Sequence, residues 1–475
     1  MRLIPFLLFI ISISILACGA DNSNDELPTE NANFTLQLNG IGGGQAYLIG
    51  YFADQSFRVD SADISATGLM TFSRNKPYLS GFYFVYDPNS QAAIQLLLDK
   101  DQSFSFTANA NDIINSASIQ GNTDMELLYQ NLKFEGQLQP QFQVVGAKLK
   151  GVAKESAAYQ VYKKTQDSLV SLRKNHLQDF FNNYPNSFFT KFKYAGQNPE
   201  LTDVRLPNGQ PDNEKQVAIY RYQMFDNVDF TDERLLRTPV IFNKLKKTIN
   251  ELTPQNPDSI NAITSHIAEK ALIGPEYYKF IVNWVTLNYE PTKTTLMDSE
   301  AVYVHMITNY FTYDRAFWSD SAEVYALQIR ANEMAASLVG KTAPDVQAQD
   351  PNGQMKSISE IKDPYIVVYM YNPTCEHCME ETPKLVQFYK EWKPKGVEVF
   401  GIAVDTDVDE WKAYVKSSGM TWPSVFDPTN RAIYGKYFVD VTPEIYVINP
   451  ERKIIAKNLK VNQIAEMIKR DKEAK

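Results

Sequence analysis

Cysteine and histidine are scarce in this chain, with 3 cysteines and 4 histidines among 475 residues. So few cysteines exclude a small fold that is held together by many disulfides. Basic residues are outnumbered, because 47 Lys and Arg stand against 56 Asp and Glu, and the formal net charge is −9. General nucleic-acid binding neutralises phosphates with basic groups, so this charge balance argues against it. After residue 17 no apolar run reaches the roughly 20 residues that span a bilayer.

The histidines do not indicate a metal site. His176, His266 and His305 have no second histidine, cysteine or acid at a convincing ligand spacing, and His176 follows Leu169 and Leu172 on an apolar stripe. We expect structural or surface roles for all three. The sequence therefore predicts neither a metal nor another cofactor.

The remaining composition is that of a folded protein, with 44% hydrophobic and 22% charged residues. Domains usually contain roughly 100–200 residues, so two to four domains are expected.

The N-terminus has the pattern of an export signal. Arg2 precedes an apolar run from Leu3 to Leu16, which is too short for a membrane span but suits a signal peptide. The run ends in Leu16-Ala17-Cys18-Gly19, which resembles a bacterial lipobox, where cleavage precedes a lipid-modified cysteine. We therefore expect a signal peptide at 1–17, lipid on Cys18, and a polar, flexible tether over 18–33. The alternative is ordinary secretion with an incidental cysteine.

Two regions with different periodicity follow the tether. Apolar residues alternate with polar ones in segments between residues 34 and 122, as in Phe34, Leu36 and Leu38, which predicts an antiparallel β domain. Between residues 124 and 336 the apolar residues fall at helical spacing, so this region is predicted to be an all-α domain.

The C-terminal residues 340–475 have the pattern of a small α/β domain. The run Tyr365–Tyr371 suits a buried central strand, and Cys375-Glu376-His377-Cys378 follows it where a helix is expected to begin. A Cys-x-x-Cys pair at such a junction indicates redox chemistry, because only the thiolate is nucleophilic and a helix N-terminus stabilises negative charge. The alternative, half of a zinc site, needs two further ligands, and the chain has no second Cys-x-x-Cys.

This domain resembles the thioredoxin-like family, in the branch of TlpA/ResA-type thiol–disulfide oxidoreductases. The resemblance rests on the following motifs: Ala343-Pro344-Asp345, NPTCEHCMEETP at 372–383, GIAVD at 401–405, WPSVFDP at 422–428 and VTPEIYVINPERKI at 441–454. It implies that Cys375 attacks, that Cys378 resolves, and that Pro443 is a cis-proline facing the pair, with Thr442 before it. The two N-terminal regions resemble the β-rich and helical segments of unknown function that precede such domains in some exported proteins.

Two residues near the pair depart from the family pattern. Thr374 replaces the usual tryptophan before the first cysteine, and His377 replaces the usual proline inside the pair. A cationic His377 would favour the Cys375 thiolate, whereas Glu376 would oppose it. We treat Glu376, His377 and Thr442 as tuning residues, and the motif leaves the redox direction open.

Glu381 is a further candidate. It shares a helical face with Cys378, Leu385 and Phe388, so we expect partial desolvation and a raised pKa. The resemblance implies that a glutamate at this position transfers the proton of the second cysteine. The alternative is a carboxylate at the edge of the stripe that reaches water.

The sequence thus predicts a lipid-anchored thiol–disulfide oxidoreductase in the cell envelope, facing the periplasm or the outer surface. Its partners would be disulfide-containing exported proteins and a membrane-embedded thiol electron donor. Reduction is the direction that the resemblance favours. One alternative is a peroxiredoxin-like peroxidase, although such an enzyme needs a threonine three residues before its cysteine and Asn372 stands there. The other is a surface ligand-binding lipoprotein whose thioredoxin unit is a scaffold.

Overall fold

The computed structural model of the chain describes residues 31–430, 433 and 436–474. The expected signal peptide and Cys18 lie outside these residues, as does most of the expected tether. The described chain forms two compact units. The first holds the residues up to 49 together with 58–169, and the second holds 50–57 together with the residues from 170 onward.

The N-terminal part of the described chain is rich in β-structure. It contains two four-stranded sheets with the orders β4-β1-β7-β8 and β3-β2-β5-β6. The alternating residues Phe34, Leu36 and Leu38 of β1 are buried. One pairing differs from the expected antiparallel pattern, because β1 pairs with β4 antiparallel but with β7 in parallel. The strands are β1 (Ala32–Asn39), β2 (Gln45–Phe52), β3 (Gln55–Asp63), β4 (Leu69–Arg74), β5 (Gly81–Tyr86), β6 (Ala93–Leu98), β7 (Ser105–Asn109) and β8 (Ser118–Gln120).

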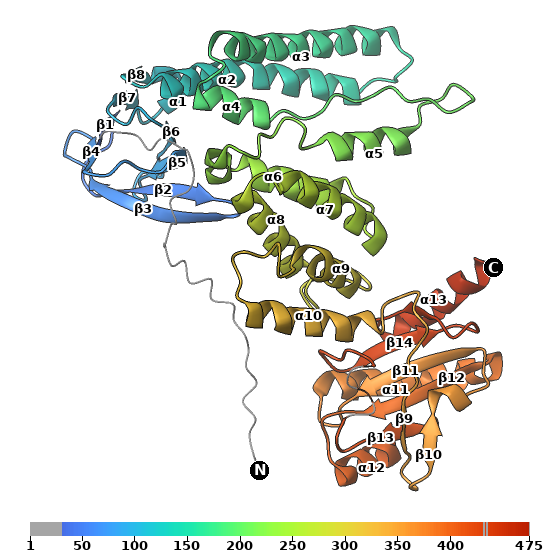
Figure 1. Ribbon diagram of the computed structural model, residues 1–475. Coiled ribbons are helices and arrows are strands. Elements are labelled where there is room, and N and C mark those ends of the chain that lie inside the picture. Colours follow the sequence, from blue (N-terminus) through green and yellow to red (C-terminus); the bar gives the residue numbers. More distant parts are fainter. Residues whose placement is uncertain (1–30, 431–432, 434–435, 475) are drawn as a thin grey trace. The chain divides into compact units, whose positions relative to one another are not determined.

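A helical region follows these strands (Figure 1). Asn122 begins it by accepting a hydrogen bond from the backbone N–H of Met125, which caps the long helix α2. The boundary between the two compact units falls within α3, between residues 169 and 170. The helices are α1 (Ile113–Ser116), α2 (Thr123–Lys150), α3 (Ala157–Asn183), α4 (Phe188–Ala195), α5 (Asn213–Gln223), α6 (Val240–Lys246), α7 (Pro257–Ala271), α8 (Pro275–Asn288), α9 (Glu300–Tyr310) and α10 (Ser321–Ala335).

The histidines of α7 and α9 have polar partners among the helices. His266 Nε2 lies 2.9 Å from the carbonyl oxygen of Tyr222, and His305 Nε2 lies 2.7 Å from Ser265 Oγ. Burial lowers the pKa of His305, which favours the neutral ring. These contacts fit the structural roles expected from the sequence. Among the residues that the structure describes, no group of three or more side chains could hold a metal ion.

The C-terminal domain is a seven-stranded sheet with flanking helices, and its strand order is β10-β9-β13-β12-β11-β14-β15. Strand β11 is parallel to β12 and antiparallel to β14. The elements are β9 (Gln347–Gln349), β10 (Met355–Ser357), β11 (Tyr365–Tyr371), α11 (Glu376–Trp392), β12 (Val397–Ala403), α12 (Val408–Ser417), β13 (Ser424–Phe426), β14 (Glu444–Ile448), β15 (Ile454–Ala456) and α13 (Val461–Glu473).

The sheet is covered on both faces, as the unbroken apolar run in β11 predicted. All seven residues of β11 are buried. Val367 and Tyr369 pack in one core with Leu385 of α11, whereas Ile366 and Val368 pack in a second core on the other face. The chain is therefore a multidomain protein with a β-rich region, a helical region and an α/β domain of the thioredoxin fold. No helix in the described part of the chain combines the length and the apolar character that crossing a membrane requires.

Candidate active site

The cysteine pair lies where strand β11 passes into helix α11. The side chain of Asn372 builds the turn between them, because its Oδ1 accepts hydrogen bonds from the backbone N–H and from the hydroxyl of Thr374, at 2.8 and 2.7 Å. Its amide in turn donates to the carbonyl oxygen of Asp405, at 2.9 Å. Cys375 then occupies the N-cap position of α11. The nucleophile expected from the sequence is thus placed where helix N–H groups favour negative charge.

The two thiols differ in accessibility. Cys375 is partly exposed and its Sγ donates to the carbonyl oxygen of Thr442, at 3.1 Å. Cys378 lies in the first turn of α11 and is fully buried. Neither of these two cysteines forms a disulfide in the structure.

The pKa values of the two thiols diverge accordingly. Burial raises the pKa of Cys375, but hydrogen bonds from the side chains of Thr442 and Cys378 and from the backbone N–H of His377 outweigh burial, and the net pKa lies below the ordinary value. For Cys378, burial dominates and raises the pKa to about 12. Near neutral pH, Cys375 is therefore the thiol that supplies a thiolate, while Cys378 holds its proton.

The loop before β14 forms the other side of the site. The Thr442–Pro443 bond is cis, as the resemblance implied. Glu444 follows it and pairs with Met370 of β11, so the loop is held beside the strand that leads to the cysteines. Glu376 and His377, the expected tuning residues inside the pair, are both exposed in the first turn of α11. Their influence on the thiols stays a prediction.

A cluster of buried and partly buried hydroxyl groups lies behind Cys378, and it was not predicted from the sequence. The carbonyl oxygen of Cys378 accepts hydrogen bonds from Thr382, at 2.7 Å, and from Tyr414 and Tyr369, at 3.3 and 3.5 Å. Thr382 Oγ1 also lies 2.7 Å from the hydroxyl of Tyr369 and 2.8 Å from that of Tyr414. Burial raises the pKa of Tyr369 and Tyr414, so these groups remain neutral and bring no charge to the thiol. The available signal was Tyr369, one of three tyrosines in a strand whose other residues are aliphatic or methionine.

The expected raised pKa of Glu381 is wrong. Burial does raise its pKa, but Lys384, at 2.6 Å from Oε1, and the backbone N–H of Val461, at 3.0 Å from Oε2, outweigh burial and hold the pKa below its usual range. The spacing correctly predicted a shielded position, since 16% of the side chain is exposed. The carboxylate lies at the N-terminus of α13, where the helix dipole favours its charged form. Its role in proton transfer stays a prediction.

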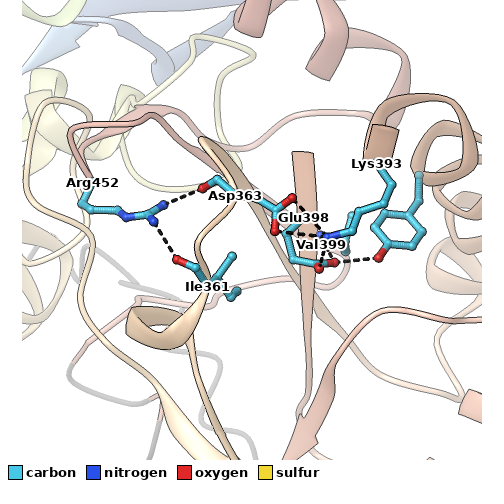
Figure 2. Close-up of polar contacts among 7 residues, drawn as sticks. Ile361, Asp363, Lys393, Glu398, Val399 and Arg452 are labelled. Carbon is cyan, nitrogen blue, oxygen red and sulfur yellow. Dashed lines mark hydrogen bonds and ion pairs between the residues drawn. The ribbon is translucent and has the colours of Figure 1, made fainter. Parts of the chain in front are cut away.

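A separate polar network fixes the far end of α11 (Figure 2). Lys393, just after the helix, lies between Asp363 and Glu398, with Nζ–O distances of 3.1 and 2.6 Å. Tyr389 also donates to Glu398, at 2.8 Å. Arg452 binds the carbonyl oxygens of Ile361 and Asp363, at 2.6 and 3.1 Å. The helix that carries the cysteines is therefore anchored at both ends.

Comparisons with known proteins agree with this fold. Residues 339–457 match the model of the AhpC/TSA family. Over 116 residues the chain is 31% identical to the thiol–disulfide oxidoreductase ResA of Bacillus subtilis (strain 168). The matched segment covers 24% of this chain and 64% of that protein. Over 117 residues it is 26% identical to ResA of Bacillus anthracis, and this match covers 25% of this chain and 67% of that protein. The chain thus spans just under two thirds of the first of these relatives.

Solved structures are similar as well. A thioredoxin domain of a thiol–disulfide oxidoreductase from Bacteroides vulgatus is 26% identical, with a TM-score of 0.27, and the match covers 28% of this chain and 96% of that one. A thioredoxin-like protein from Bacteroides caccae is 15% identical, with a TM-score of 0.46, and the match covers 57% of this chain and 99% of that one. From the family match, the relatives and the fold described above, the C-terminal domain of this chain has the thioredoxin fold and is similar to the ResA-type thiol–disulfide oxidoreductases.

Proposed function

We propose that this protein is a thiol–disulfide oxidoreductase that acts on the disulfides of exported proteins. The observation that carries the proposal is the division between the two thiols. Cys375 is partly exposed at a helix N-terminus with a lowered pKa, and Cys378 is buried three residues later with a raised pKa. An attacking thiolate next to a protonated partner is the arrangement that two-step disulfide exchange requires.

In the first step the Cys375 thiolate attacks one sulfur of a substrate disulfide. A bond forms between Cys375 Sγ and that sulfur, the substrate S–S bond breaks, and the departing substrate thiolate takes up a proton. Because the Thr442 carbonyl oxygen lies beside Cys375, the loop before β14 is in place to meet the substrate chain.

In the second step Cys378 gives up its proton and attacks Cys375 Sγ. The Cys375–Cys378 bond forms, the mixed disulfide breaks, and the second substrate sulfur leaves as a thiol. The substrate gains two electrons and the protein loses two, so a dithiol donor must reduce the pair again. We assign this role to a membrane-embedded thiol donor.

An equilibrium titration of the purified protein against glutathione tests the function and its direction. Reversible interconversion of the Cys375–Cys378 pair with a potential of about −270 mV, which is typical of thioredoxin, is the result expected for a reductant. A value of about −120 mV would reverse the assigned direction. If Cys375 and Cys378 do not interconvert between dithiol and disulfide, the result would favour the alternative of a ligand-binding lipoprotein whose thioredoxin unit is a scaffold.

Anchoring through lipid on Cys18 is part of the same proposal. Its support is the short apolar run that ends immediately before this cysteine. We expect the protein to fractionate with membranes, and the Cys18→Ala variant to be released from them. Unchanged membrane retention of that variant would contradict the lipid anchor.

A further inference from the structure

The loop at residues 436–443, which we call the cis-proline loop, is in contact with the helical region. It carries Thr442, whose carbonyl oxygen accepts a hydrogen bond from the Cys375 thiol at 3.1 Å and whose side chain lowers the pKa of that thiol by a hydrogen bond. Any group that fixes this loop therefore affects the surroundings of the reacting sulfur.

Arg330 of α10 contacts the loop from the helical side. Its guanidinium lies 5.6 Å from the ring centre of Phe438 and 5.5 Å from that of Tyr303 of α9, which are distances typical of cation–π contacts. Glu290 accepts a hydrogen bond from Arg330 at 2.8 Å and so fixes the direction of the guanidinium. Asp440 of the loop is close enough for its charge and that of Arg330 to interact.

A second contact to the loop passes through a buried charge cluster. Lys457 is fully buried in the α/β domain, and its Nζ lies 3.6 Å from Glu300 Oε1 and 4.0 Å from Asp298 Oδ1. Both acids precede or begin α9 and are themselves 3% exposed. The amide of Asn458 also donates to Glu300 Oε1, at 2.8 Å.

Lys457 connects this cluster to the cis-proline loop. Its ammonium lies 5.0 Å from the ring centre of Tyr446, and the Tyr446 hydroxyl donates to the carbonyl oxygen of Phe438, at 3.3 Å. Phe438 is thus held at its ring by Arg330 and at its backbone by Tyr446. The buried carboxyl of Glu444, directly after Pro443, also interacts with the Lys457 charge.

Asp298 adds evidence that this junction is tightly constrained. It has a φ of 58°, a left-handed conformation that is uncommon for residues other than glycine. Its Oδ2 accepts a hydrogen bond from the backbone N–H of Val339, at 3.0 Å, in the segment that joins the helical region to the sheet. Such conformations persist where the surroundings fix them.

We propose that Arg330 and Glu300 are positioning residues, through which the helical region holds the cis-proline loop in place for the reaction of Cys375. The inference deepens the proposed function and rests on the same thiol. It assigns a role to a region that shares no motif with the thiol chemistry. Neither residue touches the sulfur, and each acts through the position of Thr442.

Alkylation of Cys375 in the full-length, reduced protein tests this inference. The rate of reaction with iodoacetamide is measured from pH 5 to 10, and its midpoint gives the pKa of the thiol. Displacement of Thr442 alters both of its contacts with the thiol, namely the carbonyl oxygen that accepts from Cys375 Sγ and the side chain that lowers the pKa of Cys375. Arg330→Gln is therefore expected to shift the midpoint and to change the rate of alkylation at pH 7 by about threefold or more, the value of one ordinary hydrogen bond. Glu300→Gln is expected to act in the same direction.

Two further variants separate positioning from general stability. Arg330→Lys keeps the charge and should restore part of the rate. Arg315→Gln removes a comparable arginine, which pairs with Glu269 at 3.1 Å and stacks on Tyr310 elsewhere in the helical region, and should leave the profile unchanged. Thermal unfolding shows which variants are folded. If Arg330→Gln does not fold, the alkylation profile of Glu300→Gln, which retains the shape of the side chain, tests the inference.

A profile that superimposes on that of the wild type in both folded variants would overturn the inference. Because alkylation needs no redox cycle, that result is distinct from failure of the proposed function, which the glutathione titration reports.

Discussion

Cys375→Ser is expected to reduce catalysed disulfide exchange to the background rate. Serine cannot form a nucleophilic anion near neutral pH, and no other described thiol is accessible, because Cys378 is buried with a pKa of about 12. The measurement is the rate of insulin-disulfide reduction with dithiothreitol as the electron source. For the wild type the rate should rise with pH through a midpoint below pH 9, the ordinary thiol pKa, because the pKa of Cys375 is lowered.

Cys18→Ser is the matched control, because it removes the third cysteine of the chain and should leave the rate unchanged. Folding of Cys375→Ser is checked by thermal unfolding. Reduction of insulin by folded Cys375→Ser at the wild-type rate would show that Cys375 is not the attacking group.

Cys378→Ser is expected to stop the reaction after the first step. Cys375 still attacks, because the Thr442 side chain and the backbone N–H of His377 continue to favour its thiolate, but no second thiol is available to release the substrate. A covalent adduct with the substrate protein should therefore accumulate, and reductant should reverse it. The measurement is intact mass under conditions in which the wild type forms no stable adduct.

The double variant Cys375→Ser, Cys378→Ser should form no adduct, which controls for other sites of attachment. Accumulation of an adduct in Cys375→Ser, with none in Cys378→Ser, would exchange the roles of the two cysteines.

Glu381 is tested on this same resolving step. If its carboxylate receives the proton of Cys378, Glu381→Gln should slow the decay of the mixed disulfide by about tenfold or more, since general-base assistance is typically larger than that. The exposed neighbour Glu380 provides the matched control, Glu380→Gln. If the mixed disulfide decays at the same rate in the two variants, Glu381 does not receive the proton, and its role is limited to its structural contacts with Lys384 and Val461.

Local features of the C-terminal domain could be predicted because they depend on residues that are close in sequence. The run Tyr365–Tyr371 is a buried strand, and Cys375 begins the helix that follows it. Periodicity also placed Glu381 on a shielded helix face correctly. Each of these predictions requires only the period of a strand or a helix and the distribution of apolar residues.

The predictions failed where a side chain's partners were left out of the argument. The pKa of Glu381 is lowered first by Lys384, three residues along α11, which the periodicity argument overlooked, and then by the backbone N–H of Val461, which an argument along α11 cannot include. The hydroxyl of Tyr414 reaches Cys378 from α12 in the same way. The parallel pairing of β1 with β7 likewise joins strands that are separated in the sequence by β2 to β6.

The buried charges around Lys457 have a consequence for how this protein can vary among its relatives. Loss of Lys457 alone would leave Asp298 and Glu300 buried without a cation, at a cost of about 3–5 kcal/mol for a broken buried pair. Loss of both acids would leave the ammonium with Glu444 as the remaining carboxyl known to interact with its charge. The helical region and the α/β domain are therefore expected to be inherited as one unit, with substitutions at 298, 300 and 457 occurring together.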